Sequence, residues 1–261
     1  MPLAAQDAQP LPVRHVPSRR VWRWLALGLA DLRAVPLASL AQGLAVTLGG
    51  WIVIAVAQRY WWVGPGAVSG FVLVGPILCT GLYELSRLRA RGESPGLAAV
   101  VQAWRRESRP LVRLGLLLLA LGTLWVLVST LLFWLFVTTP IRSPMDFLRY
   151  AAVEQGNLLF TLWAILGGLG SAAVFALFAV SPPLLLGRAV GLRQALLTSV
   201  RAVGENPVTM ALWAGVILAA IALSFATAML GFILAVPLIG HATWHAYKDL
   251  VVTDGVPLRY E

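Results

Sequence analysis

The sequence predicts an all-α membrane protein, a polytopic bundle of six transmembrane helices arranged as three hairpins, with amphipathic helices at the interface. Three observations lead to this fold class. Apolar residues make up 59% of the chain and charged residues 12%, where soluble domains carry about a quarter charged residues. The apolar residues gather in five long blocks between residues 37 and 247, and a helix needs roughly 20 apolar residues to cross a bilayer. The basic residues fall in alternate segments between these blocks.

The chain divides into a tail, a membrane domain and a second short tail. Residues 1–17 contain four prolines and no apolar core, so we expect a disordered N-terminal tail that also holds His15. A cleavable signal peptide would need an apolar core there, so the first span serves as its own insertion signal. Residues 18–252 form the six-helix domain, and residues 253–261 are the C-terminal tail.

Six spans follow from the lengths of the apolar blocks. The last block, residues 208–247, contains no charged residue. As one helix it would be roughly 60 Å long, twice the thickness of the hydrocarbon core. We therefore divide it at a turn near Ser224–Gly231. The predicted spans are 37–57, 66–85, 111–137, 158–186, 207–226 and 229–249.

The distribution of cations predicts the orientation. Of the twenty Lys and Arg residues, only Arg59, Arg142 and Arg149 lie on one side of the predicted spans. An arginine at the bilayer centre costs about 2.5–3.5 kcal/mol on insertion scales, so this division indicates that both termini are cytoplasmic. All the basic residues except Lys248 are arginine and Ala, Leu and Gly are abundant, which favours a GC-rich bacterial genome as the source. The net charge of +9 adjoins apolar spans, so we expect anionic lipids at the cytoplasmic face as partners and no nucleic acid.

The chain repeats one plan three times. The segments that start at Gly70 and Gly231 align Gly, Phe, Leu and Pro without a gap, and Pro182 gives a weaker third copy. A basic amphipathic stretch precedes Pro36, Pro110 and Pro207 in turn. We expect these stretches to be helices in the inner-leaflet interface, with solvated helical loops as the alternative. The small residues of spans two and four favour close helix packing over a glycine-lined pore.

Few side chains in or beside the spans can carry chemistry. They are Glu84, His241 and His245, accompanied by Tyr83, Trp244 and Tyr247. The two histidines are four residues apart and share a helix face, so they could bind a divalent metal. In the repeat register Glu84 takes the place of His245, which predicts a carboxylate facing a histidine in a metal site or a proton relay. The alternative is a structural Glu–His hydrogen bond, with Trp244 and Tyr247 as interfacial anchors.

The motifs exclude more functions than they support. The chain has no glycine-rich nucleotide loop, and the span midplanes carry no charged group of the kind that ion-coupled pumps use. No cofactor is predicted beyond the metal alternative, since both span histidines lie on one helix and cannot flank a haem. We favour a non-enzymatic accessory or assembly component that binds a membrane-protein partner or a second copy. The alternatives are a passive transporter or channel for a small solute, and a metal-binding membrane enzyme using Glu84, His241 and His245.

Four stretches resemble a known family. They are ADLRAVP, which ends at Pro36, GFVLVGPIL from Gly70, SVRAVGENP from Ser199 and GHATWHAYKDL from Gly240. Over residues 22–252 the chain resembles the uncharacterised bacterial integral membrane proteins of domain of unknown function 2189. The resemblance implies a bacterial inner-membrane protein. It implies no activity, so no catalytic residue is carried over from it.

Overall fold

The fold is helical throughout the part of the chain that the computed structural model describes, residues 9–59, 79–105, 109–136 and 157–260. Residues 79–89 form a further helical segment. The described residues contain no β-strand, only isolated β-bridges such as Val13–Val251. This confirms the all-α class for those residues. The helices are α2 (Arg20–Ala34), α3 (Pro36–Arg59), α5 (Leu97–Arg105), α6 (Arg109–Phe136), α8 (Asn157–Phe178), α9 (Ser181–Gly187), α10 (Leu192–Glu205), α11 (Pro207–Ala226) and α12 (Phe232–Leu250).

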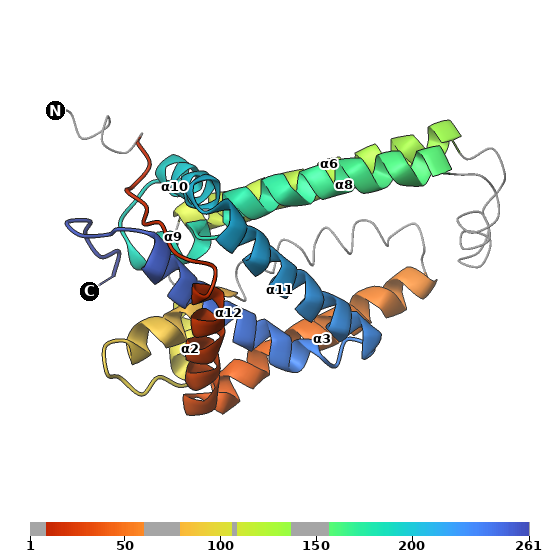
Figure 1. Ribbon diagram of the computed structural model, residues 1–261. Helices are drawn as coiled ribbons and strands as arrows, with labels where there is room; N and C mark the ends of the chain where they lie inside the picture. Colours follow the sequence, from red (N-terminus) through yellow and green to blue (C-terminus); the bar gives the residue numbers. More distant parts are fainter. Residues whose placement is uncertain (1–8, 60–78, 106–108, 137–156, 261) are drawn as a thin grey trace.

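The helices divide into a base and a set of projecting arms (Figure 1). We call α2, α9, α10 and residues 79–89 the base, which gathers at the left of the view together with the C-terminal half of α12. The apolar helices α3, α6, α8 and α11 extend from this base toward the opposite side. The short helices of the base therefore lie together at one end of the long apolar ones.

Among the described residues, four helical stretches are long and apolar enough to cross a membrane. These stretches are Pro36–Val56, Arg109–Phe136, Leu158–Gly187 and Pro207–Ala226. They correspond to predicted spans one, three, four and five. A membrane protein with several apolar helices is what the composition predicts, since long uncharged runs are stable only where lipid replaces water.

The count of six spans and the three-hairpin arrangement are not confirmed. Most of predicted span two, residues 66–78, lies outside the described residues. Predicted span six is the helix α12, but its second half carries two histidines and the pair Lys248 and Asp249, and it is not among the four apolar candidates. The arms α6 and α8 do lie side by side, where the Trp163 indole stacks against Trp125 at a centroid distance of 5.5 Å and donates to Ser129 Oγ at 3.1 Å.

Predicted span four is two helices rather than one. α8 ends at Phe178 and α9 begins at Ser181. Pro182 and Pro183 occupy the first turn of α9, and proline has no N–H to continue the hydrogen bonding of the preceding helix. The break brings α9 into the base, where all seven of its residues are buried.

The three basic amphipathic stretches are helices, as predicted. They form α2, α5 and α10, each of which comes just before a helix with proline at or near its start: Pro36, Pro110 and Pro207. Their inner faces pack within the protein. The buried positions of α2, for example, are Val21, Trp24, Gly28, Asp31 and Leu32, which follow helical spacing.

Helix α12 is the centre of the packing. It crosses α2 so closely that a Cβ at Gly28 would stand 2.7 Å from the backbone nitrogen of Ala242. It meets α3 in the same way, since a Cβ at Gly43 would stand 2.3 Å from the carbonyl oxygen of Ile233. Small residues at helix crossings let backbones approach where apolar burial supplies no driving force. These two glycines allow α2 and α3 to pack closely against the backbone of α12.

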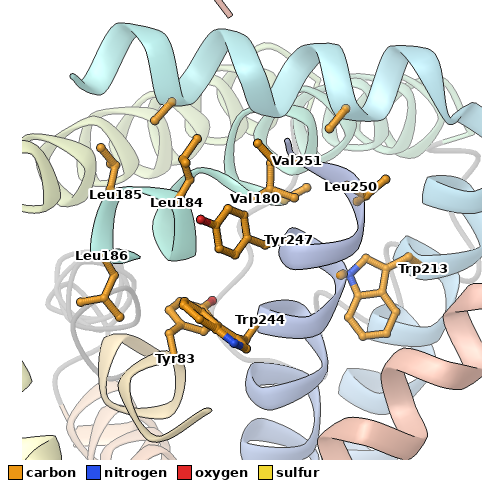
Figure 2. Packing of buried hydrophobic residues seen from close by; sticks show 14 of the residues in the cluster. Tyr83, Val180, Leu184, Leu185, Leu186, Trp213, Trp244, Tyr247, Leu250 and Val251 are labelled. Carbon is orange, nitrogen blue, oxygen red and sulfur yellow. The ribbon is translucent and has the colours of Figure 1, made fainter. Parts of the chain in front are cut away.

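A hydrophobic cluster fills the base between α9 and α12 (Figure 2). Figure 2 shows Trp244 and Tyr247 of α12 in one cluster with Tyr83 and the leucines Leu184 to Leu186 of α9. Trp24 and Trp213 extend the cluster, with their rings edge to face at a centroid distance of 5.8 Å. Buried aromatic side chains of this size supply much of the packing energy of a small core.

Residues 9–17 differ from the predicted disordered tail. Val13 pairs with Val251, and the Leu11 backbone N–H donates to Thr198 Oγ1 at 2.9 Å. Asn206 holds the segment from both sides, accepting from the Val16 N–H at 2.8 Å and donating to the Arg14 carbonyl at 3.0 Å. The prolines keep this segment extended, and the remaining backbone groups find partners on α10 and the C-terminal segment. Composition alone could not reveal these distant partners.

Candidate functional site

A buried polar cluster joins four helical segments at the base. We call it the Asp31 cluster. It consists of Asp31 on α2, Ser39 on α3, Ser86 and Arg89 in segment 79–89, and His241 and His245 on α12. Asp31 is 7% exposed, and Ser39, Ser86 and His241 are 0–1% exposed.

The Asp31 carboxylate is the acceptor at the centre of the cluster. Its Oδ2 accepts from Ser86 Oγ at 2.6 Å and from His245 Nε2 at 2.9 Å. Its Oδ1 accepts from the Arg89 guanidinium at 2.8 Å, and the same Arg89 nitrogen also donates to the Ala30 carbonyl at 3.0 Å. A buried carboxylate is tolerated only when it is paired and hydrogen-bonded, and here donors from two other elements meet that requirement.

The hydroxyl groups around His241 determine which ring nitrogen carries hydrogen. Ser86 gives its one hydrogen to Asp31, so its 2.7 Å contact with His241 Nδ1 requires Nδ1–H to be the donor. Ser39 Oγ lies 2.9 Å from His241 Nε2 and 2.8 Å from the Val35 carbonyl. In a neutral ring with its hydrogen on Nδ1, Nε2 is an acceptor, so the single Ser39 hydrogen goes either to Nε2 or to the Val35 carbonyl.

Local sequence explains how these side chains meet. Asp31 stands on the inward face of α2, on the same spacing as Val21, Trp24 and Gly28. His241 and His245 are one turn apart on α12, so both point toward the crossing of α2 and α12. The close approach at Gly28 brings the carboxylate within hydrogen-bond distance of His245, and Ser86 links the carboxylate to His241.

The electrostatics of Asp31 reflect two opposing effects. Burial raises the pKa of its carboxyl, but the hydrogen bonds from His245 and Ser86 and the charge of His245 outweigh burial. The pKa of Asp31 is therefore below its ordinary value of 3.8. The carboxylate is ionised at neutral pH and holds its donors in place.

The predicted partnership of Glu84 with a histidine is replaced by a different one. Both carboxylate oxygens of Glu84 accept from the Arg87 guanidinium, at 2.6 and 2.7 Å. Glu84 and Ser86 are two residues apart on a helix and do not share a face, so with Ser86 directed at His241 the Glu84 carboxylate points elsewhere. The carboxylate that faces a histidine is Asp31, on α2.

Gln42 extends the polar side of α3 one turn beyond Ser39. Its amide nitrogen donates to the Ala38 carbonyl at 3.2 Å, and its buried Oε1 has no hydrogen-bond partner among the described residues. Gly81 lies directly against this oxygen, because a Cβ there would stand 2.4 Å away. The glycine leaves room for the glutamine in a tight helix contact.

The metal hypothesis gains no support from the described part of the chain. Within those residues no group of three or more His, Cys, Asp and Glu side chains is placed to hold a metal ion. The Nε2 atoms of His241 and His245 point at Ser39 and Asp31 respectively, not at a shared point. A metal site at Glu84, His241 and His245 stays a prediction.

The aromatic candidates are core residues rather than interfacial anchors. Tyr83, Trp244 and Tyr247 are 6%, 4% and 1% exposed. Trp244 and Tyr247 stack edge to face at a centroid distance of 5.3 Å, and both pack near Gly187 of α9. An anchor in the headgroup region would expose its polar edge to water, which this burial prevents.

Sequence reasoning missed Asp31, Ser39, Ser86 and Arg89. One signal could have found Asp31, since it is a carboxylate at an apolar position of an amphipathic helix. The serines carried no such signal, because a hydroxyl in a helix commonly bonds to its own backbone. Ser39 does so too, and its second partner depends on the helix crossing.

Residues 63–187 match the family model described as "Predicted integral membrane protein (DUF2189)". The resemblance inferred from the sequence motifs is confirmed over these residues. No curated protein and no solved structure matches the chain.

Proposed function

We propose that this chain, whose residues 63–187 match a family of predicted integral membrane proteins, is a non-enzymatic component of a bacterial inner membrane that helps to assemble or hold a larger membrane complex. The observation that carries the proposal is the exposure of the arms. The 28 residues of α6 include only three buried ones, Leu114, Gly115 and Leu132. Along the rest of α6 the side chains are exposed or only partly covered by α8, so lipid or a partner helix must cover the exposed apolar ones.

The chemistry of the base supports a structural role. The side chains of the Asp31 cluster are committed to one another across α2, α3, α12 and residues 79–89. An active site needs groups that remain available to a substrate, whereas these donors and acceptors are used in holding helices together. The cluster therefore supports a rigid base that presents the apolar arms.

The positions of the described residues that flank predicted span two support the proposal of six spans. α3 has 24 residues and so spans about 36 Å at 1.5 Å per residue. Residues 79–89 lie again in the base, beside the start of α3, where Ser86 reaches the cluster. A chain that leaves the base along α3 and re-enters it by residue 79 favours six spans with both termini cytoplasmic.

Site-specific photo-crosslinking tests the proposal. A photoreactive amino acid is placed at Leu124 or Leu131, which are exposed on α6, and at the buried Leu114 as matched control. We expect discrete protein adducts in membranes from the two exposed positions and none from Leu114. An adduct of twice the 28.1 kDa chain mass would identify a second copy as the partner.

A different result would refute the assembly role. If both exposed positions capture only lipid, and a deletion strain shows its membrane complexes unchanged on native gels, the assembly role is wrong. A passive transport role would then be the next hypothesis to test, by solute flux into vesicles that contain the purified protein.

A further inference from the structure

A small basic cavity lies between the first half of α2 and the last turns of α12. Its volume is about 140 Å³. It shares His245 with the Asp31 cluster, and none of the other residues of that cluster lines it. The residues that line it are Arg20, Arg23, Trp24, Leu27, His245, Lys248 and Asp249.

The one carboxylate in this cavity is already used. Asp249 forms a bidentate ion pair with Arg20, with 2.6 Å between Arg20 Nε and Asp249 Oδ2, and it also accepts from the Trp24 indole at 2.9 Å. Arg23 and Lys248 form no ion pair with any described residue. Neither cation therefore has a carboxylate within ion-pair distance among the described residues, although Asp249 attracts Arg23 and Asp254 attracts Lys248 at longer range.

More positive charge surrounds Lys248. The Arg14 guanidinium lies against the same turn of α12, with its Nη1 3.3 Å from the carbonyl oxygen of Lys248. Arg14 and Arg188 both repel the Lys248 ammonium, and Asp254 attracts it. Cations that repel one another are stabilised when a further anion binds among them.

The surface beside the cavity is apolar. Trp22 and Leu27 on the outer face of α2 are 60% and 37% exposed, and Leu37 at the start of α3 is 73% exposed. An amphipathic helix that exposes Trp and Leu next to arginines is typical of a helix lying among lipid headgroups. The first apolar helix, α3, starts two residues after α2 ends, so α2 lies at the depth of the headgroups if α3 crosses the bilayer.

We propose that this cavity binds the phosphate of an anionic phospholipid, with Arg23 and Lys248 as its ligands. Arg20 is held by Asp249, which also accepts from the Trp24 indole, and forms part of the wall of the site. The acyl chains extend along the exposed apolar side chains of α2 and the start of α3. The inference requires the membrane location but not the assembly role, so either can fail without the other.

Native mass spectrometry of the full-length protein in detergent tests the site. Phosphatidylglycerol and phosphatidylcholine are titrated separately against the wild type, R23Q/K248Q and the control R33Q, which removes an exposed arginine at the last turn of α2 outside the cavity. We expect phosphatidylglycerol to bind more tightly than phosphatidylcholine. The double variant should lose affinity by roughly fivefold for each cation removed, and R33Q should stay within twofold of the wild type.

Two further binding measurements complete the test. R23K/K248R retains both charges and should bind as the wild type does, which separates loss of charge from loss of folding. Inorganic phosphate is titrated as a competitor and should displace phosphatidylglycerol only weakly, because it lacks the apolar contacts. Equal binding of the two lipids, an unchanged R23Q/K248Q, or full displacement by inorganic phosphate would each overturn the proposal.

Discussion

Asp31 is the residue on which the packing of the base depends most. Its carboxylate accepts hydrogen bonds from Ser86, His245 and Arg89, which lie on two other elements. Removing one member of a buried charged network leaves the others unpaired, and that penalty exceeds the value of the bonds themselves. The residue is thus a sensitive probe of the architecture.

The first prediction concerns the substitution Asp31→Asn. The amide keeps the shape but loses the charge that Arg89 and His245 face, so we expect the free energy of unfolding to fall by roughly 2–4 kcal/mol. Reversible denaturation of the detergent-solubilised protein, followed by tryptophan fluorescence, measures this change. The matched control is Asp254→Asn, at an exposed carboxylate, where the change should stay within about 0.5 kcal/mol. Equal effects at the two positions would refute a special role for Asp31.

The second prediction concerns acid. The pKa of Asp31 is below its ordinary value of 3.8, so folding favours the ionised carboxylate. Its contribution to stability is fully present above the unfolded-state pKa and is lost as the pH falls through the folded-state pKa. We expect the unfolding free energy of the wild type to decrease below about pH 4 more steeply than that of Asp31→Asn. Parallel pH profiles for the two proteins would contradict this assignment.

At the scale of single residues, the sequence predicted the two histidines of the Asp31 cluster but not the carboxylate that they face. It selected His241 and His245 because polar groups in an apolar context are expensive and few. It selected Glu84 as their partner from the repeat register, and the partner is Asp31. A register aligns positions along helices, but it says nothing about which other helix crosses at that point. That information lies in the close approach at Gly28.

At the scale of elements, the helix crossings depend on glycine. A Cβ at Gly28 would meet the backbone of α12 rather than a flexible side chain, so the two helices would have to move apart. The distance between Asp31 and the histidines would grow with them. Packing and the polar cluster are therefore coupled at this crossing.

The third prediction concerns Gly28→Ala. We expect a loss of roughly 1–3 kcal/mol in the free energy of unfolding, since overpacking against a backbone cannot be relieved by a rotamer change. The control is Gly204→Ala in α10, where nothing lies within 4 Å of the added Cβ and alanine is the better helix former. Urea or SDS titrations of both variants measure the difference. A stabilised or unchanged Gly28→Ala would mean that α2 does not pack on α12 at this distance.

Most helices could be predicted from the sequence, but the break within predicted span four and the contacts of residues 9–17 could not. Apolar runs and flanking prolines predicted the starts of α3 and α11, and the amphipathic stretches before them predicted α2 and α10. The break between α8 and α9 was missed, although Pro182 and Pro183 mark it, because proline is also tolerated as a bend inside a span. Residues 9–17 were missed because their partners are nearly 200 residues away in the chain, as with Leu11 and Thr198.

At the scale of the whole molecule, the buried polar contacts and the long apolar helices lie in different parts of the fold. Its buried ion pairs and hydrogen-bonded histidines lie in the base, and the four most apolar helices lead away from it. This separation matches the segregation of arginines that the sequence shows. Lipid as the solvent of the arms explains both, because charged groups are stable at the base and costly along the arms.

The most direct test of this account is the membrane topology. Green fluorescent protein and alkaline phosphatase are fused in parallel after Phe136, at the far end of α6, and after Glu261. We predict active phosphatase without fluorescence at Phe136, and fluorescence without phosphatase activity at Glu261. A fluorescent fusion at Phe136 would show that α6 does not carry its far end across the membrane, and phosphatase activity at Glu261 would place the base outside the cell; either result would contradict the account.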